Sequence, residues 1–361
     1  GLGPRLHAFQ KACNLLYRQS VAGKQPAWIH RYLEAGKPPA VIQLMREDRW
    51  KNDLPCVIRP DLLLMEEGFS LTELDSVPGG IGLTAWMGKA YGLNAECRMS
   101  NAECQTGMLG GFISAFSLQP SAFNLGAIVI SEEAKDYRPE MEWLVEENAK
   151  CKMQNAKLTV CDPKELEYQS TGVFLRGERV DVIYRFFELF DLPNISGVEK
   201  MIAAAREGQV RVTPPFKAQL EEKLWLALFW FPQLADFWRR ELGDRYFRDL
   251  QKIIPFTWVL DPSPLPPHAV IPHLGIHDWK QMGAFSQKQR ELILKISGFS
   301  ERAWGSRGVF LGSDLSAEEW KAAVNQALAE FETHPHLLHR FAHTALTEHS
   351  YYNFEQEKIV P

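Results

Sequence analysis

Four charged side chains alternate along two short stretches on either side of an expected turn. Arg59 and Asp61 precede the turn, and Glu73 and Asp75 follow it. Side chains two positions apart lie on the same face of a strand, so two paired strands would carry all four on one face. Opposed carboxylates with Cβ atoms ~5 Å apart repel each other and destabilise a strand pair. A divalent cation removes that penalty, and Mg²⁺ prefers hard oxygen ligands such as carboxylates and substrate phosphates.

The register of this hairpin follows from its expected three-residue loop, residues 66–68, which ends in Gly68. Such loops commonly end in a left-handed residue, and glycine fits there best. Pairing Met65 with Phe69 then places Asp61 opposite Glu73, and Arg59 opposite Asp75. The same register puts the apolar side chains of Val57, Leu63, Leu71 and Val77 on the charged face. The alternative is a solvated hairpin face with an ordinary Arg–Asp pair, and a one-residue slip would scatter the cluster.

A second candidate site is a glycine-rich loop between two expected strands, 291–295 and 309–311. Three glycines would let the backbone approach a triphosphate and present its N–H groups, namely Gly298, Gly305 and Gly308. Hydroxyl donors come from Ser297, Ser300 and Ser306. Lys295 and Arg307 supply positive charge for ATP phosphates. The loop lacks the GxxxxGK[ST] pattern of a Walker loop, and an exposed hairpin loop with ordinary basic residues is the alternative.

Composition limits the classes of protein that the chain can represent. Its 361 residues carry a formal net charge of -5, which argues against non-specific nucleic-acid binding. The six cysteines form no CxxC pair, so a reduced, cytoplasmic compartment is expected. The longest fully apolar run, residues 224–231, is less than half of the ~20 residues that span a membrane. We expect a globular protein of two or three lobes.

The remaining pattern predicts a mixed α+β and α/β fold. A helix is expected over 7–36 and a β region over 56–77. Strands at 127–130, 158–160 and 180–184, with a helix around 141–145, form a βαβ unit with a parallel sheet. Residues 197–260 read as mostly helical. Ser316 and Glu319 form a capping box before a helix whose apolar stripe is Trp320, Val324, Ala327, Leu328 and Phe331.

Together these motifs resemble the circularly permuted ATP-grasp family, in particular the synthetase domain of glutathionylspermidine synthase. Arg59-x-Asp61 followed by Glu73-x-Asp75 is similar to the magnesium motif of that branch, although the family usually has asparagine where Asp75 stands. The carboxylates precede the glycine-rich loop, which is the permuted order. The segment 215–223 resembles the family segment whose lysine reaches ATP, and we choose Lys223 over Lys217.

The resemblance implies roles for two further segments. Lys295 matches the second ATP lysine, and residues 337–341 resemble the hinge strand whose backbone meets adenine, with His339 where glutamine is more usual. The βαβ region resembles a Rossmann-like pre-ATP-grasp lobe. The expected division is 1–120 for the N-terminal helices and metal hairpin, 121–195 for the pre-ATP-grasp lobe, and 196–361 for the helical segment and ATP lid.

The activity implied by the resemblance is an ATP- and Mg²⁺-dependent carboxylate–amine ligase that forms an amide through an acyl phosphate. Asp61, Glu73 and Asp75 would hold Mg²⁺, and the lysines, Arg307 and the loop would hold ATP, with Arg59 stabilising the transferring group. A small-molecule or peptide carboxylate and an amine are the implied partners, without nucleic acid or membrane. Candidate anchors for the carboxylate are Arg98, Arg138 and Arg185. A catalytically silent nucleotide- or peptide-binding relative and a kinase are the alternatives.

Overall fold

The computed structural model describes residues 1–90, 107–117, 125–150, 157–303, 305, 307–348 and 350–360. One lobe is built on a parallel sheet with the order β4-β3-β8-β9. Its strands are β3 (Leu125–Ile130), β4 (Lys157–Cys161), β8 (Val182–Phe186) and β9 (Arg211–Thr213). The expected βαβ unit is confirmed, because α6 (Arg138–Lys150) connects β3 to the parallel strand β4.

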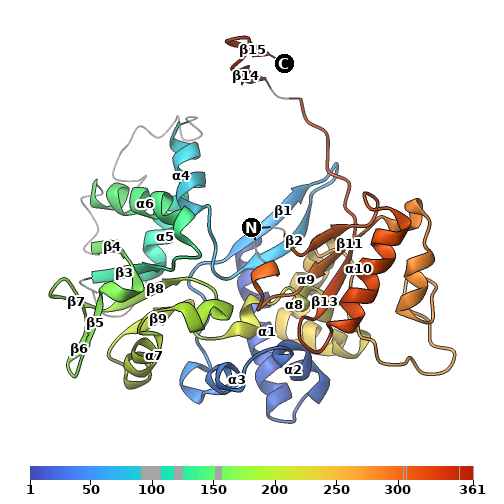
Figure 1. The fold of residues 1–361 in the computed structure, drawn as a ribbon, viewed down its shortest axis with the longest axis horizontal. Helices are drawn as coiled ribbons and strands as arrows, with labels where there is room; N and C mark the ends of the chain where they lie inside the picture. Colours follow the sequence, from blue (N-terminus) through green and yellow to red (C-terminus); the bar gives the residue numbers. More distant parts are fainter. Residues whose placement is uncertain are drawn as a thin grey trace.

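Alternation along β3 explains why this sheet is buried on both faces. All six residues of β3 are buried. Ala127 and Val129 belong to the largest apolar cluster, whereas Ile128 and Ile130 belong to a second cluster with residues of α5 and α6. Helices α4 (Ile81–Ala90), α5 (Gly107–Ser117) and α6 lie together beside the sheet (Figure 1). Such a two-sided apolar run is typical of parallel sheets covered by helices.

A second lobe is built on an antiparallel sheet with the order β10-β13-β11-β12. Its strands are β10 (Thr257–Val259), β11 (Leu292–Ile296), β12 (Val309–Leu311) and β13 (His336–Arg340). Helix α10 (Ala317–Ala329) packs on this sheet through Trp320 and Val324, which are fully buried. Its N-terminus carries the expected capping box of Ser316 and Glu319.

Further helices come from the N-terminal part and the middle of the sequence. They are α1 (Leu2–Val21), α2 (Ala27–Glu34), α3 (Pro39–Arg46), α7 (Val198–Glu207), α8 (Leu224–Leu228) and α9 (Ala235–Ile253). The single helix expected over 7–36 is wrong, since the chain turns between α1 and α2. Gly23 there has φ +72°, and Pro26 directly precedes α2. Both residues interrupt a helix, because glycine favours a left-handed turn and proline lacks the N–H for an intrahelical bond.

The hairpin of β1 (Arg59–Leu64) and β2 (Phe69–Asp75) lies between the two lobes (Figure 1). The pairs Arg59–Asp75 and Asp61–Glu73 are as expected. Nearer the turn the register differs, because Leu64 and not Met65 pairs with Phe69. The ladder passes from Asp61–Glu73 to Leu62–Leu71, so Thr72 is an extra, bulged residue on β2.

This bulge corrects the expected apolar face of the hairpin. A one-residue bulge reverses the direction of every side chain beyond it. Leu71 therefore packs in the main core with no exposed surface, on the side opposite to Glu73. Leu63 remains on the charged side. The bulge thus lets one short strand serve both the core and the charged face.

Other expectations change in detail. The strand expected over 180–184 is divided at Asp181 between β7 (Glu178–Val180) and β8. β7 belongs instead to a small antiparallel sheet with β5 (Leu166–Gln169) and β6 (Gly172–Leu175). The mostly helical stretch 197–260 also contains β9 and β10. Near the C-terminus, β14 (Tyr351–Asn353) and β15 (Lys358–Val360) form a hairpin that projects from the body (Figure 1).

None of the helices that the structure describes is long and apolar enough to cross a membrane.

Candidate functional site

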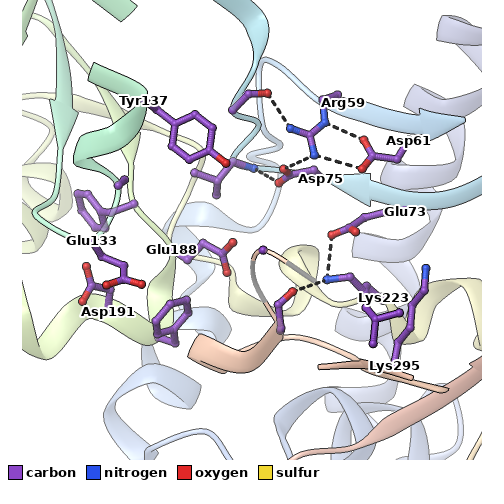
Figure 2. A pocket seen from close by; sticks show the side chains of 18 of the residues that line it. Arg59, Asp61, Glu73, Asp75, Glu133, Tyr137, Glu188, Asp191, Lys223 and Lys295 are labelled. Atoms are coloured by element: carbon purple, nitrogen blue, oxygen red, sulfur yellow. Dashed lines mark hydrogen bonds and ion pairs between the residues drawn. The ribbon is translucent and has the colours of Figure 1, made fainter. Parts of the chain in front are cut away.

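A cavity of about 420 Å³ lies where the β1–β2 hairpin meets both lobes. The hairpin contributes one wall, and β11, β12 and the loop between them contribute another. The third wall comes from residues that follow β3 and β8 (Figure 2). The charged side chains that line the cavity are Arg59, Asp61, Glu73, Asp75, Glu133, Glu188, Asp191, Lys223 and Lys295.

The Arg59 guanidinium holds the two aspartates of the hairpin together. Its Nε donates to Asp61 Oδ1 at 2.7 Å, and its Nη2 lies 3.2 Å from Asp61 Oδ2 and 3.4 Å from Asp75 Oδ2. Its Nη1 donates to the carbonyl oxygen of Gly79 at 2.6 Å. Bidentate Arg–carboxylate contacts fix geometry as well as charge. The positions of both carboxylates are therefore set before any ligand binds.

Asp75 is the more buried of these two carboxylates. Its pKa is raised to about 6, chiefly by burial and also by the charge of Glu73, although Arg59 and the backbone N–H of Val77 favour the charged form. That N–H donates to Asp75 Oδ1 at 2.8 Å. A carboxyl group with this pKa gains from additional positive charge, as a bound cation would provide.

Lys223 lies opposite the hairpin and pairs with Glu73, with Nζ 2.8 Å from Oε1. Burial alone would lower the pKa of this lysine, but the charge and hydrogen bond of Glu73 outweigh it, so the pKa is raised. Its Nζ also donates to the carbonyl oxygen of Ala303 at 3.3 Å. One ammonium therefore joins the hairpin to the loop that follows β11 (Figure 2).

Lys295 projects from β11 toward the same hairpin. Its Nζ lies 3.5 Å from the carbonyl oxygen of Thr72, the bulged residue. Burial lowers the pKa of Lys295, and Lys223 lowers it too, whereas Glu73 favours its charged form. Lys223 and Lys295 thus share one side of the cavity, as expected, whereas Lys217 lies outside it.

The wall formed by the parallel-sheet lobe is acidic, and its carboxylates were not among the residues predicted from the sequence. Glu133 follows β3, and Glu188 and Asp191 follow β8. Burial raises the pKa of Glu188 to about 8, with the charges of Glu221 and Asp75 adding to the effect. Figure 2 shows these three carboxylates facing the hairpin across the cavity. Ligands of open α/β sheets bind at the carboxyl ends of strands, so these loops were recognisable once the strands were placed.

The three hairpin carboxylates supply the oxygen ligands that a hard cation prefers. Asp61, Glu73 and Asp75 all line the cavity, and Mg²⁺ is typically held by such oxygens together with substrate phosphates. Across the described ranges, no three Asp, Glu, His or Cys side chains are already arranged to hold a metal ion. Arg59 and Lys223 neutralise the carboxylates instead. The donor set therefore fits Mg²⁺ provided that Lys223 moves toward an incoming phosphate.

The glycine-rich loop divides into a buried base and a part that reaches the cavity. Ser297 is fully buried, and its Oγ donates to the Glu222 carboxylate and accepts from the backbone N–H of Leu224 at 3.0 Å. A Cβ at Gly298 would lie 2.9 Å from the carbonyl oxygen of Glu221. Ser297 and Gly298 therefore serve close packing here, and neither lines the cavity.

Farther along, Gly305 lines the cavity with φ +61°, which favours glycine. Gly308 packs tightly, since a Cβ there would lie 2.7 Å from the carbonyl oxygen of Arg302. Arg307 Nη1 lies 3.7 Å from Glu133 Oε1, so the loop meets the other lobe at this point. Ser306 lies outside the described residues.

Three other sequence candidates lie away from the cavity. His339 is buried in β13, pairs in register with both Thr257 and Ile293, and contacts Thr257 Oγ1 through Nδ1 at 2.8 Å. Arg185 is fully buried, bonded to Glu221 at 2.6 Å and to backbone carbonyls. Arg138 pairs with Asp162 at 2.6 Å. The two arginines therefore stabilise local structure, and the third candidate, Arg98, lies outside the described residues.

The fold is similar to that of a glutathione synthetase-like effector from Globodera pallida, solved in its apo form. The alignment has a TM-score of 0.51 and 12% identity, and covers 94% of this chain and 71% of that one. A protein from Methylobacillus flagellatus, provisionally named a gamma-glutamylcysteine synthetase, aligns with a TM-score of 0.44 and 9% identity over 88% of this chain and 76% of its own.

No protein-family model matches the sequence, and no curated protein sequence matches it either. The chain thus has a mixed α/β, glutathione synthetase-like fold, which agrees at a coarse level with the expected ATP-grasp class. The narrower resemblance to glutathionylspermidine synthase, the circular permutation and the three-part division stay predictions.

Proposed function

We propose that the chain is an ATP- and Mg²⁺-dependent carboxylate–amine ligase of the circularly permuted ATP-grasp type. The observation that carries the proposal is the convergence of three hairpin carboxylates with two lysines from distant segments around one cavity. ATP needs both kinds of group, because cations bind its phosphates and carboxylates hold the Mg²⁺ that bridges them.

In this proposal the two sides of the hairpin cavity have different tasks. Lys223 and Lys295 bind phosphate oxygens, and Lys223 leaves Glu73 as the nucleotide enters. Asp61, Glu73 and Asp75 would hold Mg²⁺, which neutralises charge on the transferring phosphoryl group. Arg59 keeps the aspartates aligned and faces the same group. This positioning accounts for most catalysis in phosphoryl transfer, because little covalent chemistry is left to the protein.

The acidic wall supports an amine as the acceptor. Glu133, Glu188 and Asp191 present carboxylates opposite the phosphate-binding lysines. They would attract a cationic amine and hold it beside the acyl phosphate formed from the carboxylate substrate. Burial raises the pKa of Glu188 to about 8. Once ionised beside a cationic amine, Glu188 is suited to accept the amine's proton, because its proton affinity is closer to that of an amine than an ordinary carboxylate's.

The loop between β11 and β12 would protect the acyl phosphate from water. Ala303 and Gly305 of this loop line the cavity, and Arg307 reaches Glu133 on the other lobe. A loop that closes over bound ATP excludes water and prevents hydrolysis of reactive intermediates.

The test is product analysis after incubation with Mg-ATP and a library of carboxylic acids and amines. Ligation predicts ADP release that requires both partners, together with a new amide mass. ADP with a phosphorylated product would indicate a kinase, and ATP binding without turnover would indicate a silent relative. Glu73→Gln and Lys295→Ala should each abolish ADP formation and leave the circular dichroism spectrum unchanged, and persisting activity in both variants would refute the site assignment.

A further inference from the structure

Lys217 is a buried cation that the proposed ligase site does not use. Only 2% of the residue is exposed. Its ammonium donates to Asn14 Oδ1 and to the carbonyl oxygen of Asp53, each at 2.9 Å. Both acceptors are uncharged, and no ion pair joins Lys217 to a carboxylate within the described ranges. The Asp53 carboxylate is near enough to favour the charged form of Lys217 but forms no ion pair with it. A buried charge without a direct ion-pair partner is costly, so the surroundings of this ammonium need explanation.

The lysine borders a second cavity of about 310 Å³, formed by α1, α3 and the turn after α3. None of the residues that line it lines the hairpin cavity. Helix α3 lies well below the hairpin in Figure 1. The charged residues around the second cavity are Arg18, Lys24, Arg46, Glu47, Asp48, Lys51 and Lys217.

Part of the positive charge around this cavity has no matching acid. Arg46 is neutralised by a bidentate contact with Glu34 at 2.7 and 2.6 Å, and Glu47 is taken by Arg206 at 3.0 Å. Four cations then remain against Asp48 in the lining and Asp53 beside Lys217, a formal excess of +2 (4 − 2). Within the part of the chain that the structure describes, none of these four cations forms an ion pair.

Helix capping does not account for these cations. Cations are favourable near the C-terminal end of a helix, where free carbonyls carry negative charge. At the end of α1, however, the carbonyls of Arg18, Gln19 and Ser20 already accept from the backbone N–H groups that follow the helix. Arg18 instead donates to the carbonyl oxygen of Lys51 and to Asn52, at 3.3 Å each, and so holds part of the rim in place.

From this geometry we infer a binding site for a small phosphate ester, with Lys217 at its floor and Arg18, Lys24 and Lys51 at its rim. A phosphate dianion would match the excess charge and accept hydrogen bonds from several directions. The apolar side chains of Leu15, Val21 and Met45 line the same cavity and would contact the organic part of the ester. In the free protein, burial lowers the pKa of Lys217 to about 8, and a bound dianion would reverse that shift.

The site is tested by titration calorimetry of the full chain with inorganic phosphate and with glycerol 3-phosphate, at constant ionic strength and without nucleotide. Lys217→Met removes the ammonium at the floor of the cavity, but it also removes the hydrogen bonds to Asn14 and Asp53. This variant is therefore informative only if it folds. The main variant is therefore Lys24→Gln/Lys51→Gln, because both lysines are exposed. Its matched control is Lys200→Gln/Lys288→Gln, which removes the same charge from exposed positions outside both cavities.

The double rim variant should weaken binding of the ester at least about tenfold, and the control should bind like the wild type. Lys295→Ala should also retain binding, which separates this site from the hairpin cavity and from the success or failure of the ligase proposal. If neither inorganic phosphate nor glycerol 3-phosphate bound, the inference would be overturned. Equal binding by the rim variant and the wild type, or loss of binding in Lys295→Ala, would overturn it as well.

Discussion

At the scale of single residues, the cavity is an arrangement of charges that depend on one another. Lys223 is nearly buried and is the cation nearest to Glu73, while Asp75 and Glu188 also interact with its charge. Removing Lys223 leaves several acids without this cation. Removing the charge of Glu73 instead relieves repulsion among the acids that remain. The two partners of the same ion pair should therefore differ in their effect on stability.

We expect Lys223→Met to lower the free energy of unfolding by about 3 kcal/mol at pH 7, since it strands a buried charge. Glu73→Gln should cost less than half of this. Lowering the pH to 5 should restore part of the stability of Lys223→Met, because Asp75, whose pKa is raised to about 6 and whose charged form Lys223 favours, becomes protonated between these pH values. Urea unfolding at both pH values measures this, and a larger loss in Glu73→Gln than in Lys223→Met would contradict the argument.

Asp75 gives a separate prediction for pH. Burial raises its pKa from 3.8 to about 6 in the folded protein, so the folded state binds a proton that the unfolded state has released between these values. This contribution to stability is complete below pH 3.8 and is lost as the pH rises through about 6. Asp75→Asn does not titrate. The stability of this variant relative to wild type should therefore increase from pH 4 to pH 7, by at most about 3 kcal/mol.

The measurement is chemical unfolding of both proteins at several pH values. Asp236→Asn is the control, because that aspartate is 96% exposed and should show no such trend. Asp75→Asn also carries the residue that the family resemblance leads us to expect, so it should retain ligase activity. A pH-independent difference between Asp75→Asn and the wild type would show that the pKa of Asp75 is not raised in the folded protein.

At the scale of elements, the base of the glycine-rich loop depends on a buried ion pair outside the cavity. Lys37 pairs with Glu222, and their side chains are 1% and 2% exposed. Glu222 also accepts from Ser297, and the carbonyl oxygen of Ser297 accepts from the N–H of Lys223 at 3.0 Å. Lys37 Nζ lies 5.1 Å from the ring centre of Phe299. The pair thus fixes the start of the loop beside Lys223.

Breaking this pair should cost about 3–5 kcal/mol in either Lys37→Met or Glu222→Gln, because each leaves one buried polar group without its partner. The double variant Lys37→Met/Glu222→Leu should be more stable than the sum of the single effects predicts. The single variants should also raise the KM for ATP, since each disturbs the side chain at position 222, to which Ser297 donates. Denaturant unfolding and ATP kinetics test this, with Lys135→Met, from an exposed ion pair, expected to behave like wild type. Additive single effects would contradict the coupling.

The elements also show how far the sequence could predict the site. The pairing of Arg59 with Asp75 and of Asp61 with Glu73 was predictable, because alternation and the turn constrain both strands. The bulge at Thr72 was not, since it arises where Leu71 turns into a core built from distant helices. Similarly, a glycine-rich loop indicates that its backbone lies close to another group, but the sequence does not show whether that group is a ligand or part of the protein. At Gly298 the neighbour is the protein's own segment around Glu221.

At the scale of the whole molecule, the cavity exists only when both lobes and the hairpin are assembled. Its acidic wall follows strands of the parallel sheet, and its lysines lie on segments at the antiparallel sheet. Local patterns identified the hairpin and the lysines but missed Glu133, Glu188 and Asp191, because their proximity depends on how the lobes pack. The Arg307–Glu133 contact at 3.7 Å is one point where the lobes meet across the loop.

A ligand that contacts both lobes should therefore stabilise the whole molecule against unfolding. Mg-ATP at about 100 times its dissociation constant should add about 2.7 kcal/mol of stability, seen as a higher melting temperature. EDTA should remove this shift, since without Mg²⁺ the nucleotide triphosphate faces Asp61, Glu73 and Asp75 with no intervening cation. Lys24→Gln/Lys51→Gln should keep the full shift, because its lysines border the other cavity. A shift with ATP that is unchanged by EDTA would mean that the hairpin carboxylates hold no metal, and the assignment of Mg²⁺ to this hairpin would then be wrong.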